Sequence, residues 1–196
     1  MFNKQSSVVG PPSSGRKASR VAWLLATGFG SGYLKPAPGT WGSLAGLLAW
    51  LLLVGGLRRF GGSWGAWALL AAPAVLSLIA VWAAQRVVNE TGQKDPSFIV
   101  IDEWAGLWFA LTPLLFTLTL QPQPWSLWVA RLVAPFMLFR LFDIWKPGLV
   151  DTAQGLPGGW GVVMDDVLAG ILAGLIAWPL DQWLGAQSLL NPGLWR

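Results

Sequence analysis

The acidic residues of this 196-residue chain are few and unevenly placed. There are nine, and all but Asp181 fall between Glu90 and Asp166. Histidine and cysteine are absent. Imidazole-based zinc sites, histidine general bases and thiolate chemistry are therefore excluded. Any catalysis must use carboxylates, Lys, Arg, hydroxyls, backbone amides or a metal ion.

Two pairs of carboxylates, Asp102/Glu103 and Asp165/Asp166, each stand at the start of a hydrophobic stretch, and Asp143 stands at the end of another. Carboxylates near a membrane span are usually paired, solvated or bound to a metal. If these five converge, they repel one another unless a cation lies among them. With only oxygen ligands, the natural cation is Mg²⁺. Alternatively, acidic residues in the first turn of a helix stabilise its dipole and do nothing else.

Two further segments contain groups that suit a phosphate. The first, Thr27 to Ser43, is rich in Gly, Ser and Thr and contains Lys35. It leads into a predicted helix, whose free amides favour anions. In the alternative interpretation it is a Pro/Gly-rich loop capped by Thr40.

The second segment, Phe139 to Pro147, contains Arg140, Asp143 and Lys146. On a helix these three share a side. Two cations beside one carboxylate suit a phosphate held next to a metal. The alternative is an ordinary salt-bridged face at the membrane interface.

The elements that position these residues are predicted from hydropathy. Hydrophobic residues make up 54% of the chain and charged residues 11%, against roughly 25% charged in soluble domains. We therefore predict an all-α, multihelical integral membrane protein with about four to five membrane-embedded helices. Five stretches support this prediction: Trp41–Leu57, Trp64–Ala84, Trp104–Leu120, Trp125–Phe139 and Val167–Leu184.

Five spans in simple alternation place the three polar segments on one side of the membrane. Nine of the 13 basic residues fall on that side, which predicts that it is cytoplasmic. We predict a disordered basic tail over 1–22, a membrane domain over 23–184 and a C-terminal tail over 185–196. The cations form no dense stripe, so no nucleic-acid partner is expected.

Taken together, three blocks of sequence resemble the phosphatidylglycerophosphatase A family. They are Gly28–Gly32 with Pro38–Ser43, then Lys94–Glu103, and then Phe139–Pro147 with Gly158–Asp166. The resemblance implies a Mg²⁺-dependent bacterial enzyme of the inner (cytoplasmic) membrane that converts phosphatidylglycerophosphate to phosphatidylglycerol. Some members have histidines near the second and third blocks; this chain has none, so a histidine-based mechanism is untenable here.

Carried over by position, the family's acidic residues fall on Asp102, Glu103, Asp143, Asp165 and Asp166, which we expect to be catalytic and to bind the metal. Its glycine and threonine block falls on Gly39, Thr40 and Gly42, and its basic residues on Arg140 and Lys146. With Lys35 and Ser43, these are the expected phosphate-binding residues.

We expect a water molecule activated by the metal to attack phosphorus, and an aspartyl-phosphate on Asp165 or Asp166 is the competing mechanism. Two other functions remain open. One is a Mg²⁺-dependent enzyme like the CDP-alcohol phosphotransferases, although their aspartate array cannot be placed here. The other is a small transporter or channel.

Overall fold

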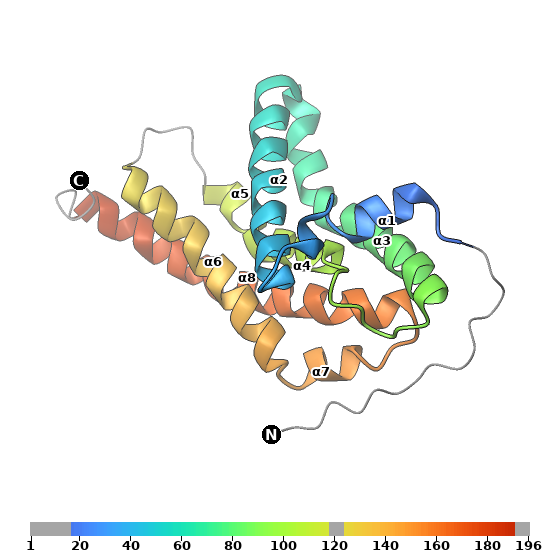
Figure 1. The fold of residues 1–196 in the computed structure, drawn as a ribbon. Coiled ribbons are helices and arrows are strands. Elements are labelled where there is room, and N and C mark those ends of the chain that lie inside the picture. Colours follow the sequence, from blue (N-terminus) through green and yellow to red (C-terminus); the bar gives the residue numbers. More distant parts are fainter. Residues whose placement is uncertain (1–16, 118–123, 191–196) are drawn as a thin grey trace.

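The computed structural model describes residues 17–117 and 124–190, and every regular element in this part of the chain is a helix. The all-α prediction is therefore confirmed. Figure 1 shows the arrangement, and the bounds in chain order are α1 Arg20–Ala26, η1 Ser31–Tyr33, α2 Pro38–Phe60, η2 Gly62–Trp64, α3 Gly65–Thr91, α4 Ile101–Leu111, α5 Leu114–Thr117, α6 Trp125–Trp145, α7 Leu149–Ala153 and α8 Gly159–Leu190.

Within the described residues, three helical segments are long and apolar enough to cross a membrane: Pro38–Phe60, Gly62–Thr91 and Gly159–Leu190. The 23 residues of α2 rise about 35 Å, which exceeds a hydrocarbon core of about 30 Å. Helices α2 and α3 form a hairpin that projects from the rest of the molecule (Figure 1). The chain is thus a membrane protein, as its composition predicts.

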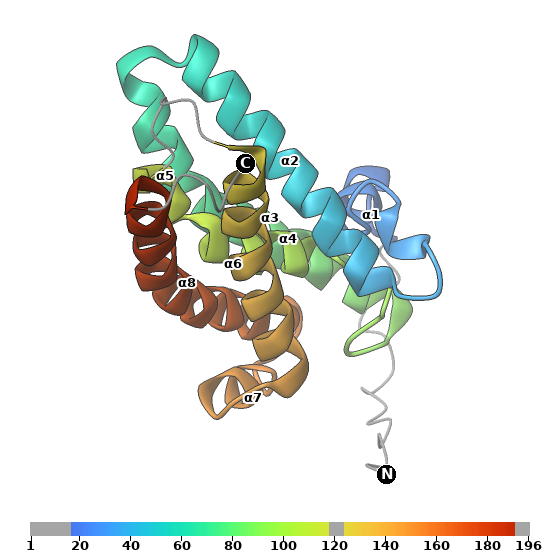
Figure 2. The same cartoon turned by 90° about the vertical axis from the view of Figure 1, so that its left-hand side faces the viewer.

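Helix α4 differs from the span predicted over Trp104–Leu120. It has 11 residues, so it rises only about 16 Å and does not cross a bilayer. The helix ends at Leu111 because Pro113 lacks the N–H that would continue the hydrogen-bond pattern, and Thr112 donates to the Phe109 carbonyl three residues back instead. Nine of its residues are buried, and Figure 2 shows it surrounded by α2, α3, α6 and α8. An interior helix and a membrane span look alike in hydropathy, which explains the difference.

Two predicted boundaries fall inside helices. Helix α1 starts at Arg20, where the Ser19 hydroxyl accepts a hydrogen bond from the Ala22 amide, so part of the predicted 1–22 tail is helical. Helix α8 continues past residue 184 to Leu190. Residues 1–16 and 191–196, which make up the remainder of the two predicted tails, lie outside the described residues.

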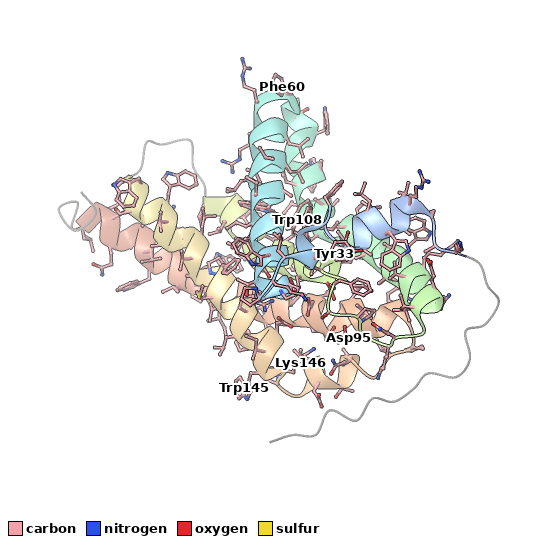
Figure 3. The ribbon with its side chains drawn as sticks, viewed as in Figure 1. Tyr33, Phe60, Asp95, Trp108, Trp145 and Lys146 are labelled. Carbon is pink, nitrogen blue, oxygen red and sulfur yellow. The ribbon has the colours of Figure 1, made fainter. Side chains whose placement is uncertain are left out.

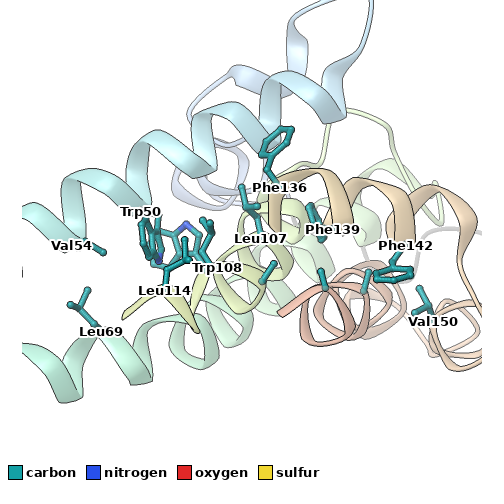
Figure 4. Close-up of a cluster of buried hydrophobic side chains, with 14 residues drawn as sticks. Trp50, Val54, Leu69, Leu107, Trp108, Leu114, Phe136, Phe139, Phe142 and Val150 are labelled. Carbon is teal, nitrogen blue, oxygen red and sulfur yellow. The ribbon is translucent and has the colours of Figure 1, made fainter. Parts of the chain in front are cut away.

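The interior is held together by aromatic and aliphatic side chains from α2, α4, α6 and α8. Trp50, Leu107, Trp108 and Phe139 are among the buried residues of this cluster (Figure 4). The Trp108 indole also donates a 2.9 Å hydrogen bond to the Gly46 carbonyl of α2. This packing fixes α4 against α2 and α6, and so fixes the two carboxylates at the start of α4.

Candidate active site

A first group of polar side chains gathers around Arg140, where α2, α4 and α6 meet. The Arg140 guanidinium lies 3.3 Å from Glu103 Oε1 and 2.8 Å from Asp143 Oδ2. It also donates to the Ser43 hydroxyl at 3.3 Å, and that hydroxyl lies 3.4 Å from Glu103 Oε2. One cation thus fixes the positions of two carboxylates and a hydroxyl from three helices.

Two glycines at the start of α2 make this approach possible. A Cβ at Gly42 would lie 2.6 Å from Glu103 Oε2, and a Cβ at Gly39 would overlap the same carboxylate. Pro38 occupies the first turn of α2, where its missing N–H costs nothing. Gly39 and Gly42, which the sequence analysis assigned to phosphate binding, therefore also allow the start of α2 to pack closely against Glu103 and Arg140.

A second group gathers around Lys146, which ends α6 in the left-handed conformation at φ 49°. Its ammonium forms an ion pair with Asp165. The other oxygen of Asp165, Oδ1, is buried and has no hydrogen-bond partner among the described residues. Asp102, Asp165 and Asp166 are only 7%, 4% and 4% exposed. A buried carboxylate oxygen without a donor is costly unless a cation or solvent reaches it.

The two groups form one site. The negative charges of Glu103, Asp95 and Asp165 act on Asp102. Asp166 in turn lies within the field of Asp143, Asp102, Asp165 and Glu103. The structure therefore brings together all five carboxylates predicted from sequence, with Arg140 paired to two of them and Lys146 to a third. In Figure 3, Lys146 lies at the opposite end of the molecule from Phe60, at the tip of the hairpin.

The local environment changes the proton affinities at this site. Burial raises the pKa of Asp102 well above its usual range, and the neighbouring carboxylates raise it further. Burial also raises the pKa of Glu103, to about 7, against the opposing effect of Arg140. For Lys146, burial lowers the pKa, but the ion pair with Asp165 outweighs this and leaves it raised. Five carboxylates thus face two cations, and the site favours an additional positive charge.

No three carboxylates among the described residues are placed to hold one metal ion. Mg²⁺ does not need such a cage, because it is commonly bound through one or two carboxylates, several waters and substrate phosphates. The donor set therefore fits Mg²⁺ in two respects, namely the excess of buried carboxylates and the unpartnered Asp165 oxygen. The metal role of these residues remains a prediction.

Two predicted phosphate-binding residues lie apart from these contacts. Lys35 and Thr40 are exposed, and neither side chain forms a hydrogen bond or ion pair with another described residue. The helix also begins before Thr40, with Ala37 at the N-cap position, so Thr40 is not the cap. The amides of Gly28, Phe29 and Gly30 donate to carbonyls within their own turn and form no anion cradle.

Two residues of this region were not included in the predicted site. Asp95 is exposed, and its charge acts on both Asp102 and Asp165. Asp95 could have been found from the sequence, because it belongs to the Lys94–Glu103 block that also contains Asp102. Gln85 of α3 accepts a 2.8 Å hydrogen bond from the Gly159 amide at the start of α8. Nothing in the spacing of the sequence indicated that contact.

Comparison with known proteins gives consistent results. A family model described as phosphatidylglycerophosphatase A matches residues 24–181. A phosphatidylglycerophosphatase A of Escherichia coli K12 is 34% identical over 172 residues, covering 84% of this chain and 89% of that protein. One of Haemophilus influenzae is 35% identical over 164 residues, covering 82% and 89%.

A protein of Bacteroides thetaiotaomicron named putative phosphatidylinositol-3-phosphatase is 36% identical over 156 residues, covering 80% of this chain and 91% of that protein. No solved structure matches the chain.

Proposed function

Because this chain belongs to the phosphatidylglycerophosphatase A family, and is thus a membrane-embedded phosphatase, we propose that it acts on phosphatidylglycerophosphate. The reaction hydrolyses the terminal phosphate monoester of this lipid and yields phosphatidylglycerol and inorganic phosphate. The sequence blocks had indicated this family, and the proposal rests on the family membership.

The observation that supports it most directly is the convergence of buried carboxylates and two cations at one end of apolar helices. A lipid substrate keeps its acyl chains in the bilayer while its phosphate meets Arg140 and Lys146. These residues come from the C-terminal end of α6, and Ser43 comes from the N-terminal end of α2. A soluble enzyme would have to extract the lipid first.

We further propose that the reaction depends on Mg²⁺. Glu103 and Asp143 are already paired with Arg140, and Asp165 with Lys146. Asp102 and Asp166 form no ion pair among the described residues, so these two would hold the ion, together with water and the substrate phosphate. A divalent cation held there would offset the carboxylate charge and polarise the phosphate.

The remaining steps belong to side chains of this chain. Arg140 and Lys146 stabilise the charge that spreads over the phosphoryl oxygens in the transition state. Glu103, held by Arg140 and Ser43, accepts a proton from the attacking water. The water oxygen bonds to phosphorus as the bond to the glycerol oxygen breaks, and the proton that Glu103 accepted passes to that leaving oxygen, directly or through solvent. Direct attack by Asp165 or Asp166 is the competing mechanism, and trapping a phosphoenzyme distinguishes the two.

The location follows from the distribution of charge. The bias of basic residues in the sequence predicts that the polar segments face the cytoplasm, so we propose that the active site lies at the cytoplasmic face of the bacterial inner membrane.

The test is phosphate release from phosphatidylglycerophosphate by the purified protein, with Mg²⁺ and with a chelator. Asp102→Asn and Asp166→Asn are compared with Asp151→Asn, a change to an exposed acid on α7. We expect activity only with Mg²⁺, loss in the first two variants, and wild-type activity in the third. Full, metal-independent activity in Asp102→Asn and Asp166→Asn would refute the site.

Phosphatidylinositol 3-phosphate is the second candidate substrate, favoured by the name of the Bacteroides relative. It is assayed beside phosphatidylglycerophosphate under the same conditions. A larger kcat/KM for the inositol lipid would reassign the substrate and leave the site and its chemistry unchanged.

A further inference from the structure

An apolar groove of about 550 Å³ lies beside the candidate active site. One wall is the turn from Gly28 to Ser31 together with Leu34, and Trp104 of α4 contributes to the lining. The other wall is α2, through Ala45, Leu48, Ala49 and Leu52.

The groove has the chemistry of a hydrocarbon site. None of its lining residues carries a charge. The α2 residues recur at the spacing that places them on one face of a helix, and from Ala45 to Leu52 they extend about 10 Å along it. Leu48 and Leu52 are 59% and 68% exposed, so the groove is open along its length to the surrounding lipid.

Trp104 adds a polar group that a hydrocarbon alone does not satisfy. The side chain is 7% exposed, and its buried indole N–H has no acceptor among the described residues. Gly28, at φ +54°, leaves the space next to this nitrogen free of a side chain; a Cβ there would lie 3.1 Å from Nε1. Phe29, also at positive φ, packs its ring 5.9 Å from that of Trp104.

The groove and the phosphate site lie along the same face of α2. A Cβ at Gly42 would lie 2.6 Å from Glu103 Oε2, and a Cβ at Gly46, one turn further along α2, would lie 2.9 Å from the Trp104 ring. Since Ser43 contacts both Glu103 and Arg140, a molecule whose phosphate lies at Arg140 reaches the groove along α2. An amphiphile with a phosphate at one end and a hydrocarbon chain at the other spans both parts.

We propose that the groove holds one acyl chain of the lipid substrate and that the Trp104 indole donates a hydrogen bond to the ester carbonyl at the head of that chain. The proposal rests on the proposed function and goes beyond it by assigning the lipid part of the substrate a site of its own. A chain from bulk lipid is the other source of hydrocarbon, but it has no reason to align its carbonyl with the phosphate site.

The test compares two substrates, long-chain phosphatidylglycerophosphate and its deacylated, water-soluble headgroup. Ala49→Trp fills the groove, Trp104→Phe removes the N–H together with the five-membered ring that carries it, and Leu78→Trp is the control, on an exposed position of α3 outside the groove. Melting temperature in detergent is measured for each variant, and Leu52→Trp replaces Ala49→Trp if the latter does not fold.

For Ala49→Trp we expect the ratio of kcat/KM for the lipid to that for the headgroup to fall at least about tenfold, since several methylenes lose their site. For Trp104→Phe we expect a rise of about two- to tenfold in KM for the lipid alone, the size of one neutral hydrogen bond. Leu78→Trp keeps the wild-type ratio.

An unchanged ratio in a folded groove-filling variant means that bulk lipid alone occupies the groove, and overturns the proposal. An equal loss on both substrates overturns it as well. A wild-type protein that hydrolyses neither substrate instead overturns the proposed function, so the two failures are distinct.

Discussion

Gly106 of α4 lies against Gly170 of α8, backbone to backbone. A Cβ on Gly170 would overlap the Gly106 carbonyl oxygen, and a Cβ on Gly106 would overlap the Asp166 carbonyl oxygen. Small residues permit this kind of close helix crossing within membranes. The crossing lies one turn from Asp102 and Glu103 on α4 and one turn from Asp166 on α8, so it sets the distance between the two acidic pairs.

We predict that Gly170→Ala destabilises the protein by about 1–3 kcal/mol, because the added methyl meets backbone that cannot move aside without separating α4 from α8. Activity falls with it, since the carboxylates move apart. Thermal unfolding in detergent and phosphate release measure the two effects. The matched control is Gly56→Ala on α2, where a Cβ meets nothing within 4 Å. A Gly170→Ala variant as stable and active as Gly56→Ala would contradict this account of the crossing.

A second prediction concerns the pair of Arg131 on α6 and Asp181 on α8, which lie 3.1 Å apart and are 5% and 3% exposed. Asp181→Ala leaves a buried cation without its carboxylate, so we expect a loss of about 3–5 kcal/mol. The double variant Arg131→Met/Asp181→Ala removes both charges and should regain part of that loss. A thermal double-mutant cycle measures the coupling, and additive losses would argue against a buried pair.

The sequence predicted which acidic and basic residues gather at the site, but not the helix packing that brings them together. Two acidic pairs in an acid-poor chain indicated a shared site, and Arg140 and Lys146 were found from their spacing. Gly170, four residues before Gly174, has the spacing typical of close helix packing, but nothing in the sequence indicated that Gly106 is its partner. The burial of α4 was missed for a similar reason, since hydropathy does not distinguish lipid from protein surroundings. Lys35 suited a phosphate by type, but the structure leaves it outside the contacts of the site.

Arg140 gives a third prediction, because its guanidinium contacts Glu103, Asp143 and Ser43 at once. Lysine carries the same charge but lacks the planar fork, so it cannot reproduce these contacts together. We expect Arg140→Ala to lower kcat by about 100-fold or more and Arg140→Lys to recover only part of it. Steady-state kinetics check this, with Arg86→Ala, an exposed cation near Trp82, as the control. Full activity in Arg140→Lys would show that only the positive charge of Arg140 matters, and not its simultaneous contacts with the three side chains.

The last prediction separates stability from activity at the metal site proposed for Asp102 and Asp166. Both are buried among like charges, so the protein without metal carries repulsion that a neutral amide removes. Asp166→Asn should therefore raise the melting temperature measured in chelator while abolishing phosphate release, the usual exchange between stability and function at an active site.

Mg²⁺ should act in the opposite sense on the wild-type protein. An ion that binds only the folded state stabilises it by about 2.7 kcal/mol at a hundred times its Kd, so the melting temperature rises with Mg²⁺ concentration. In Asp102→Asn and Asp166→Asn this rise should be lost, whereas Asp151→Asn on the exposed side of α7 should keep it. If Mg²⁺ raised the melting temperature equally in the wild type and in all three variants, the ion would bind elsewhere. Only an ion that contacts Asp102 and Asp166 loses its stabilising effect when these carboxylates are replaced by amides.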